Sequence, residues 1–410
     1  MNPIYMEVRH AAPQLSPADL LRTVPHRFFF LAGIVQVALV SLWWLWVLAA
    51  RLTHLVPPPA APAPDTVVHA LAMTYGFAPL FMFGFLFTAG PKWLAVTPPP
   101  ARVWRIPGAI AVACVLPMVP LQALGIGGLR WLAGGYALAW LALCAVFAHL
   151  IRVSRASDKV HAQLVLAGLA AGAFAVGLFA AVGMPAYPWL TTIGIWLFLL
   201  PVFVAVCHRM IPFFTSSALP IVLAFRPGWL LAVMAGAPLL HGALTLAGWE
   251  RFTWLTDFPA AVFLLVLAVR WGFVQSMSNR LLAMLHVGFL WYGAGFFLAG
   301  ASSLWQLTHG PSLGLAPLHA MTIGFASSLL VAMVTRVTCG HSGRTLAADA
   351  VTWRLFQLLQ AAALLRIGAD LVGNSGLLLA AIAFWAACLV PWAVKYAPTY
   401  WRPRADGRAG

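Results

Sequence analysis

The sequence has 410 residues, of which 62% are hydrophobic and only 8% are charged. Because so few polar side chains cannot cover a water-soluble core of this size, the composition excludes an ordinary soluble globular protein. A formal charge of +15 would favour nucleic-acid binding in a soluble protein, but the basic residues here gather in alternate loops, as membrane topology requires. We therefore expect contact with membrane lipid and none with nucleic acid.

Long apolar runs bounded by proline, glycine and charged residues cover most of the chain. They are long enough for transmembrane helices and lack the alternating pattern of β-barrel strands. The sequence thus predicts an all-α integral membrane protein with about twelve transmembrane helices in one domain, residues 28–395, and shows no strong internal repeat. The expected spans are 28–50, 67–90, 106–126, 131–151, 162–183, 188–208, 228–248, 258–274, 281–304, 314–336, 352–372 and 376–395.

The distribution of charge predicts the orientation of these spans. Lysine and arginine are concentrated in every second loop, whereas the loops between hold only Arg51, Arg130 and Arg251. Basic loops stay in the cytoplasm, so both termini are expected there, with residues 1–27 and 396–410 as cytoplasmic tails. Residues 1–27 lack the apolar core and cleavage site of a signal peptide.

Histidines in or near the expected spans form two layers. The outer half of the membrane is expected to hold His69, His241 and His319, and the cytoplasmic side His208, His286 and His341. His319 and His341 are 22 positions apart, roughly 33 Å along a continuous helix, so they cannot bind one metal ion. Burying many imidazoles in lipid without partners is costly, which makes both layers candidate ligand sites.

The chemistry of these side chains favours particular cofactors. Neutral imidazole suits haem iron and copper, whereas oxygen-preferring ions would need carboxylates. All nine acidic residues lie in tails, loops or the ends of expected spans, which disfavours an ion-coupled transporter. Cys207 beside His208, and Cys339 near His341, add weak soft-ligand signals. The alternative is that some histidines only form hydrogen bonds within the helix packing.

Arginines near the cytoplasmic layer suggest a second kind of contact. Arg209, Arg336 and Arg344 lie close in sequence to its histidines, and arginine binds carboxylates through two parallel hydrogen bonds. They are candidates to bind haem propionates. The alternative is that they only fix the topology.

Four segments carry a family resemblance. They are TVVHALAMTYGFAPLFMFGFLFTAGPKWL at 66–94, CHRMIPFFT at 207–215, LHVGFLWYGAG at 285–295 and PLHAMTIGFASSLLVAMVTRVTCGHSGRTL at 317–346. Together they resemble the NnrS family of haem- and copper-containing bacterial inner-membrane proteins of nitric oxide metabolism. Where that family has a phrase of the form HAHEM, this chain has His69 to Met73 with Ala72 in place of the glutamate. The placement of His69, His241 and His319 also resembles the haem-copper oxidase core subunit.

The resemblance implies a function that the residues alone do not. It implies haem b and copper in a bacterial inner membrane, with nitric oxide either reduced to nitrous oxide or bound to relieve nitrosative stress. Turnover would need an electron donor, quinol or an external cytochrome. Two alternatives stay open: a membrane carrier for copper or haem, and a cytochrome b-like subunit that only conducts electrons. Whether the protein is an enzyme is therefore left open, with nitric oxide reductase as the candidate activity.

Overall fold

The computed structural model describes residues 16–220 and 225–406, and in these residues the chain is helical without a strand. Eleven helices are long and apolar enough to cross a membrane, which confirms the expected class. The spans are α2 (Pro25–Thr53), α3–η1–α4 (Asp65–Leu94), α5–α6 (Ala101–Ala123), α7 (Leu129–Val153), α8 (Val160–Val182), η2–α9–η3–α10 (Met184–Ala218), α11 (Gly228–Leu246), α14 (Arg280–His309), α15–η5–α16 (Ala316–His341), α17 (Ala350–Val372) and α18–η6 (Ser375–Tyr400).

One expected span is shorter than the others. The run expected at 258–274 forms α12 (Trp254–Arg270), which has 17 residues. At about 1.5 Å per residue it rises roughly 26 Å, slightly less than the hydrocarbon thickness. It packs along α14 and against α11, so its place in the fold is the one expected for the eighth span. The remaining short elements are α1 (Pro17–Thr23), η4 (Glu250–Phe252) and α13 (Phe273–Ser276).

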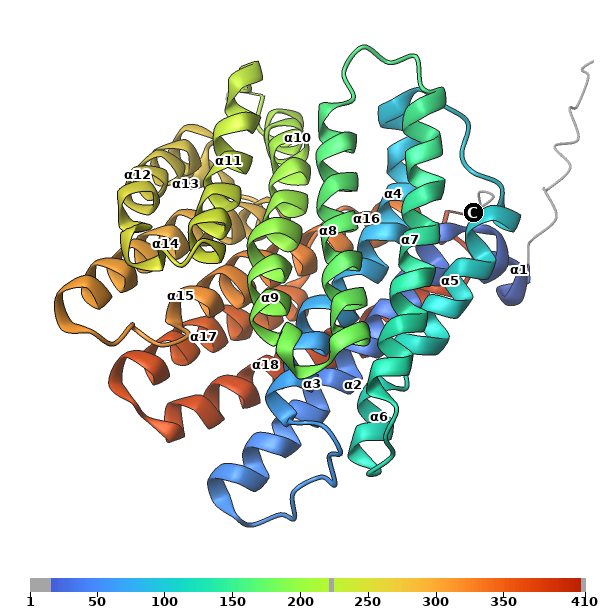
Figure 1. Cartoon of the computed structure of the whole chain (residues 1–410). Helices are drawn as coiled ribbons and strands as arrows, with labels where there is room; N and C mark the ends of the chain where they lie inside the picture. Colours follow the sequence, from blue (N-terminus) through green and yellow to red (C-terminus); the bar gives the residue numbers. More distant parts are fainter. Residues whose placement is uncertain (1–15, 221–224, 407–410) are drawn as a thin grey trace, which may run out of the picture.

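The second, sixth and tenth spans form the interior of the bundle. In an apolar stretch of 18 residues from each of these spans, 78%, 67% and 78% of the residues are buried. Among the other spans described, only α14 reaches such a value. The other helices pack around them in chain order, and α18 closes the arrangement by packing against α2 (Figure 1). Side chains on these three spans are therefore shielded from lipid, which makes them suitable carriers of polar groups.

Each interior span contains a π-helical segment in its first half. The π segments are η1 (Leu71–Gly76), η3 (Ile193–Leu199) and η5 (Ala320–Ser327), and η3 contacts both of the others. A π-helical turn leaves carbonyls without their usual partners. Side-chain hydroxyls satisfy two of them: Tyr136 donates to the carbonyl of Tyr75 at 2.8 Å, and Ser327 to that of Thr322 at 2.8 Å.

A short motif recurs at the three π segments, although no repeat is evident at the level of the whole sequence. Its copies are Thr74-Tyr75-Gly76, Thr192-Ile193-Gly194 and Thr322-Ile323-Gly324. The glycines allow close packing: a Cβ on Gly194 would lie 2.5 Å from the Tyr75 hydroxyl oxygen, and one on Gly324 would lie 2.5 Å from the Trp291 ring. The three interior spans thus share a local structural unit.

Polar side chains tether neighbouring spans inside the bundle. The Trp385 indole N–H donates to the Ser41 hydroxyl at 2.9 Å, joining α18 to α2, and the Trp392 indole donates to Thr335 at 3.0 Å, joining α18 to α16. Apolar burial does not drive helix association in lipid, so such bonds contribute to specific packing. They fix the last span against the first and the tenth.

Asp349 caps α17 outside the membrane-spanning segments. One carboxylate oxygen accepts the backbone N–H of Thr352 at 2.8 Å, and the other pairs with the Lys395 ammonium of α18. Partial burial raises the pKa of Asp349, but the hydrogen bonds from Lys395 and Thr352 outweigh it and lower the pKa to about 2. Because an unfolded aspartate has a pKa of ~3.9, the carboxylate's stabilisation is fully present above about pH 4 and is lost as the pH falls towards 2.

Replacing Asp349 is expected to destabilise α17 to a modest extent. Asp349→Ala removes the cap and the ion pair and should cost about 1 kcal/mol near neutral pH. Asp349→Asn keeps the cap, and its cost should be smaller because the Asp349 side chain is 60% exposed. Thermal unfolding in detergent, followed by circular dichroism, measures both. A gap between wild type and Asp349→Asn that persists unchanged at about pH 2 would contradict the assignment.

Candidate functional site

Three expected histidines lie towards one face of the bundle. We name the face at which α2 ends and α3 begins the outer face, following the charge distribution, and the opposite face the cytoplasmic face. His69 lies in α3 (Asp65–Ala70), His319 ends α15 (Ala316–His319) and His241 lies in α11. His69 and His319 lie within electrostatic reach of each other, whereas His241 has different neighbours. The outer layer therefore divides into a pair and a separate histidine.

The ring of His319 is held with one nitrogen available for a ligand. Its Nδ1 lies 3.0 Å from the backbone carbonyl oxygen of Leu315, one turn earlier, and the residue is buried. Because a carbonyl only accepts hydrogen bonds, Nδ1 carries the proton and Nε2 keeps its lone pair. A backbone carbonyl on Nδ1 is a common way to orient a metal-binding histidine. His319 thus has the tautomer that an axial ligand requires.

His69 is held by stacking. Its ring lies 3.9 Å from the ring of Trp44, centroid to centroid, at an interplanar angle of 24°. Its Nδ1 is buried and has no hydrogen-bond partner in the described part of the chain. A buried unpartnered nitrogen costs about 1–3 kcal/mol unless a ligand or water satisfies it. The His69 ring is therefore positioned but incompletely satisfied.

A guanidinium lies beside the His69–His319 pair. Arg366 of α17 is within electrostatic reach of both rings and forms an ion pair with Asp370 at 2.6 Å. The second carboxylate oxygen of Asp370 is buried without a hydrogen-bond partner among the described residues. Arg51 adds a more distant charge and is paired with Asp65 at 3.1 Å. The outer pair thus lies in a polar environment rather than in pure hydrocarbon.

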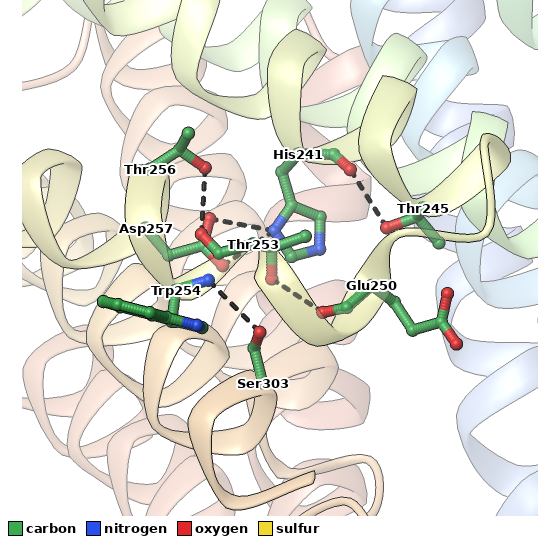
Figure 2. A network of polar contacts seen from close by, with 8 residues as sticks. All are labelled: His241, Thr245, Glu250, Thr253, Trp254, Thr256, Asp257 and Ser303. Atoms are coloured by element: carbon green, nitrogen blue, oxygen red, sulfur yellow. Dashed lines mark hydrogen bonds and ion pairs between the residues drawn. The ribbon is translucent and has the colours of Figure 1, made fainter. Parts of the chain in front are cut away.

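His241 forms a carboxylate–imidazole pair, which Figure 2 shows from close by. Its Nδ1 lies 2.9 and 3.0 Å from the two carboxylate oxygens of Asp257 in the first turn of α12, and Asp257 is fully buried. The ring also stacks on Trp196 of η3 at 3.6 Å. Because a carboxylate accepts hydrogen bonds, Nδ1 carries the proton in this pair, and the bond compensates part of the cost of burying the carboxylate. Nε2 of His241 makes no hydrogen bond to the described residues and is left for a ligand.

The structure shows that Asp257 is buried, which its place in the sequence did not indicate. As expected, Asp257 lies at the end of a span, in the first turn of α12, but its exposed fraction is 0%. The same turn contacts α14 and α11, because the backbone N–H of Trp254 donates to the Ser303 hydroxyl at 3.2 Å and Asp257 pairs with His241. Asp257 is therefore a carboxylate at the end of a span that is enclosed by neighbouring helices.

The three cytoplasmic-side histidines have three separate partners. His208 of α10 (Leu200–Ala218) pairs with His161 of α8, His286 of α14 pairs with Thr215, and the ring of His341 lies 4.5 Å from that of His26. In the described residues no group of three His, Cys, Asp or Glu side chains is arranged to hold a metal ion. The second layer is thus a set of pairs and not one cluster.

His286 resembles His69 in having an unsatisfied nitrogen. The Thr215 hydroxyl donates to the Ile211 carbonyl at 2.8 Å, so it accepts the Nε2–H of His286 at 2.9 Å. Nδ1 of His286 then keeps a lone pair, and it is buried without a partner in the described chain. This ring also carries a nitrogen suited to a ligand or a bound water.

The contacts of the candidate arginines and cysteines do not indicate one particular role. The guanidinium of Arg209 lies 5.0 Å from the ring of Trp93, and that of Arg336 lies 3.8 Å from the ring of Phe214. Arg344 follows α16 near the cytoplasmic face, and Cys339 is buried one turn before it. These contacts suit arginines that stabilise helix ends as well as arginines that bind propionates. Their assignment to a haem stays a prediction.

An apolar cavity of about 70 Å³ lies between α2, α4 (Ala78–Leu94), α10, α14 and α16 (Ser328–His341). Its wall includes Met82, Cys207, Leu285 and Met333. The next residues after Cys207 and Leu285 are His208 and His286. The cavity is therefore lined by the two helices that carry His208 and His286, and it is suited to a small apolar molecule.

Comparison with known proteins places this site in a family. The chain matches the family described as NnrS protein over residues 20–404, which includes every histidine discussed above. No curated protein matches the sequence. The chain therefore belongs to the NnrS family of membrane proteins associated with nitric oxide metabolism.

Proposed function

We propose that the protein is a haem-containing protein of a bacterial inner membrane that binds nitric oxide and reduces it to nitrous oxide or otherwise relieves nitrosative stress. The observation that carries the proposal is the His69–His319 pair. The two rings lie on different interior spans within electrostatic reach of each other; the Nε2 of His319 has its lone pair free, and His69 Nδ1 has no partner among the described residues. Family membership supplies the link to nitric oxide.

The donor set of the outer pair fits haem. Haem needs one or two imidazole nitrogens with fixed tautomers and a carrier span shielded from lipid. The Leu315 carbonyl would orient His319, and Trp44 would hold the ring of His69. The charge of Arg366 would offset the negative haem carboxylates. Haem, when bound, supplies iron whose open coordination position binds nitric oxide.

Copper has weaker support, because the described residues form no three-ligand group. His241 remains the best single candidate, since Asp257 fixes its Nδ1 and leaves Nε2 for a metal. The copper content of a His241→Ala variant tests that role. His208, His286 and His341 stay predictions as metal ligands.

The chain's apolar interior suits the substrate. Nitric oxide is a neutral diatomic molecule that dissolves in lipid, and the cavity beside Met82 and Met333 offers it apolar space inside the bundle. If turnover occurs, two nitric oxide molecules, two electrons and two protons give nitrous oxide and water. Quinol or an external cytochrome would supply the electrons.

A visible spectrum of the purified protein is the decisive first measurement. We expect stoichiometric haem with a high-spin component that shifts when nitric oxide or carbon monoxide is added, as it would if only one of the two histidines bound the iron. A protein without haem would favour the metal carrier. Stoichiometric but purely low-spin haem that ignores both gases would mean that both rings bind iron, and would favour the electron-conducting subunit.

A further inference from the structure

Sulfur-containing side chains from all three interior spans line the apolar cavity. Among the described side chains in its wall, only three contain an atom other than carbon and hydrogen, and in each of them that atom is sulfur. They are Met82 of α4, Cys207 of α10 and Met333 of α16, so the second, sixth and tenth spans contribute one each. Cys207 is buried, and the two methionines are partly buried against the core. The side chains of the wall therefore offer soft donor atoms and no hard ones.

Each sulfur residue lies midway along the part of its span that lines the cavity. On every interior span the lining continues about one helical turn before the sulfur residue and one turn after it. Residues three or four positions apart share one face of a helix, so the sulfur residue is at the centre of that face. The flanking pairs are Ala78 and Phe85, Phe203 and Ile211, and Leu329 and Val337. Because the cavity measures only about 70 Å³, three helices bring their sulfur residues to one small space.

The donor set is selective for one kind of metal ion. Thiolate and thioether sulfur prefer Cu(I), whereas magnesium and calcium ions need oxygen ligands. Zinc ions take imidazole, thiolate and carboxylate ligands, and the wall offers only one of these, the thiol of Cys207. In the described chain no three His, Cys, Asp or Glu side chains are arranged around a metal ion, but methionine is a further soft ligand and brings this set to three.

The balance of charge in the cavity also favours a monovalent ion. A Cu(I) ion and one thiolate cancel, and thioethers are neutral, so the occupied site would carry no net charge. A divalent ion with the same ligands would leave one positive charge uncompensated in apolar surroundings, where burial of charge is costly. The wall contains no carboxylate that could compensate it.

We propose that Met82, Cys207 and Met333 bind one Cu(I) ion in this cavity. A Cu(I) complex of a small thiol would load the site by ligand exchange. The copper–sulfur bond to the small thiol breaks, the bond to Cys207 forms, and the Cys207 thiol proton passes to the released thiolate, with no electron transferred. The flexible methionine side chains can adjust their sulfur atoms to the ion. The site is separate from His241 and needs neither haem nor nitric oxide, so it goes beyond the proposed function.

Competition with a Cu(I) chelator tests the site. The full-length protein, purified in detergent from copper-depleted cells, is titrated anaerobically with Cu(I) in the presence of bathocuproine disulfonate. We expect Cys207→Ala, Met82→Leu and Met333→Leu each to weaken binding at least about tenfold, because replacing even a residue that only supports a metal ligand costs about that much. Cys388→Ala and Met321→Leu are the matched controls. Both residues are fully buried outside the cavity wall, so these variants should keep the wild-type affinity.

X-ray absorption at the copper edge identifies the ligands. With less than one equivalent of Cu(I) on the wild-type protein, we expect sulfur neighbours at about 2.3 Å and no nitrogen. Wild-type thermal unfolding in the methionine variants would separate lost binding from misfolding, since exchange of methionine for leucine nearly conserves volume. These two variants decide the matter even where Cys207→Ala does not fold. Wild-type affinity in both of them, or coordination by nitrogen, would overturn the site. Nitric oxide is absent from both measurements, so failure of the proposed function would leave their result unchanged.

Discussion

Replacing His319 with alanine is expected to reduce the haem content of the purified protein to less than about a tenth of the wild-type value. The ring of His319 is oriented by the Leu315 carbonyl, and His69, whose Nδ1 has no partner among the described residues, lies within electrostatic reach of it. His69→Ala should have a similar effect, because its ring completes the same pair. Haem per chain, measured by the pyridine haemochrome assay, gives the result directly.

The matched control is His309→Ala. His309 also lies at the outer face, but it is exposed and stacks on Trp305 at 3.8 Å, away from the interior spans. It should retain full haem. Full haem occupancy in both His69→Ala and His319→Ala would remove the basis of the proposed function.

Replacing His241 with leucine is expected to destabilise the protein by about 3–5 kcal/mol, since it leaves the fully buried Asp257 carboxylate without its partner. The reason is the cost of an uncompensated charge in a medium of low polarity, not the loss of one hydrogen bond. Thermal or denaturant unfolding in detergent measures the change. Asp257→Asn should cost less, because an amide oxygen can still accept the Nδ1–H.

A double-mutant cycle isolates the interaction between the two side chains. His241→Leu combined with Asp257→Leu removes both polar groups, and the double variant should recover a large part of the stability lost in His241→Leu. Independent, additive losses would show that the two residues do not act as a pair. Thr245→Ala, on the same helix but without contact to Asp257, controls for changes in α11 itself.

Sequence reasoning predicted the fold class well because hydropathy and charge act over whole segments. The lengths of apolar runs and the absence of alternation were enough to predict helical spans near the observed ones. The order and orientation of the predicted spans also placed His69 and His319 at similar depths in the outer half of the membrane. The proximity of these two rings did not, because it depends on which faces of two non-consecutive spans meet.

The missed residues show where such reasoning fails. Asp257 was placed at the end of a span, and only the packing of α12 reveals that this end is buried. Arg366 was not among the predicted site residues, although its spacing of four residues from Asp370 inside an expected span indicates an ion pair on one helix face. His161 lies just before the expected span 162–183, and its contact with His208 depends on how α8 packs against α10.

The π-helical turns change which side chains lie on the same face of each interior span. A π turn contains one residue more than an α turn, so it shifts the angular phase of everything that follows by about 100°. His319 lies just before η5, whereas Arg336 and Cys339 come after it. The side-chain directions at the outer and cytoplasmic ends of one span therefore cannot be predicted from a single helical wheel. Deleting a single residue from η5 would bring both ends into one phase, and a deletion of that kind would turn His319 away from His69 without changing any side chain of the site.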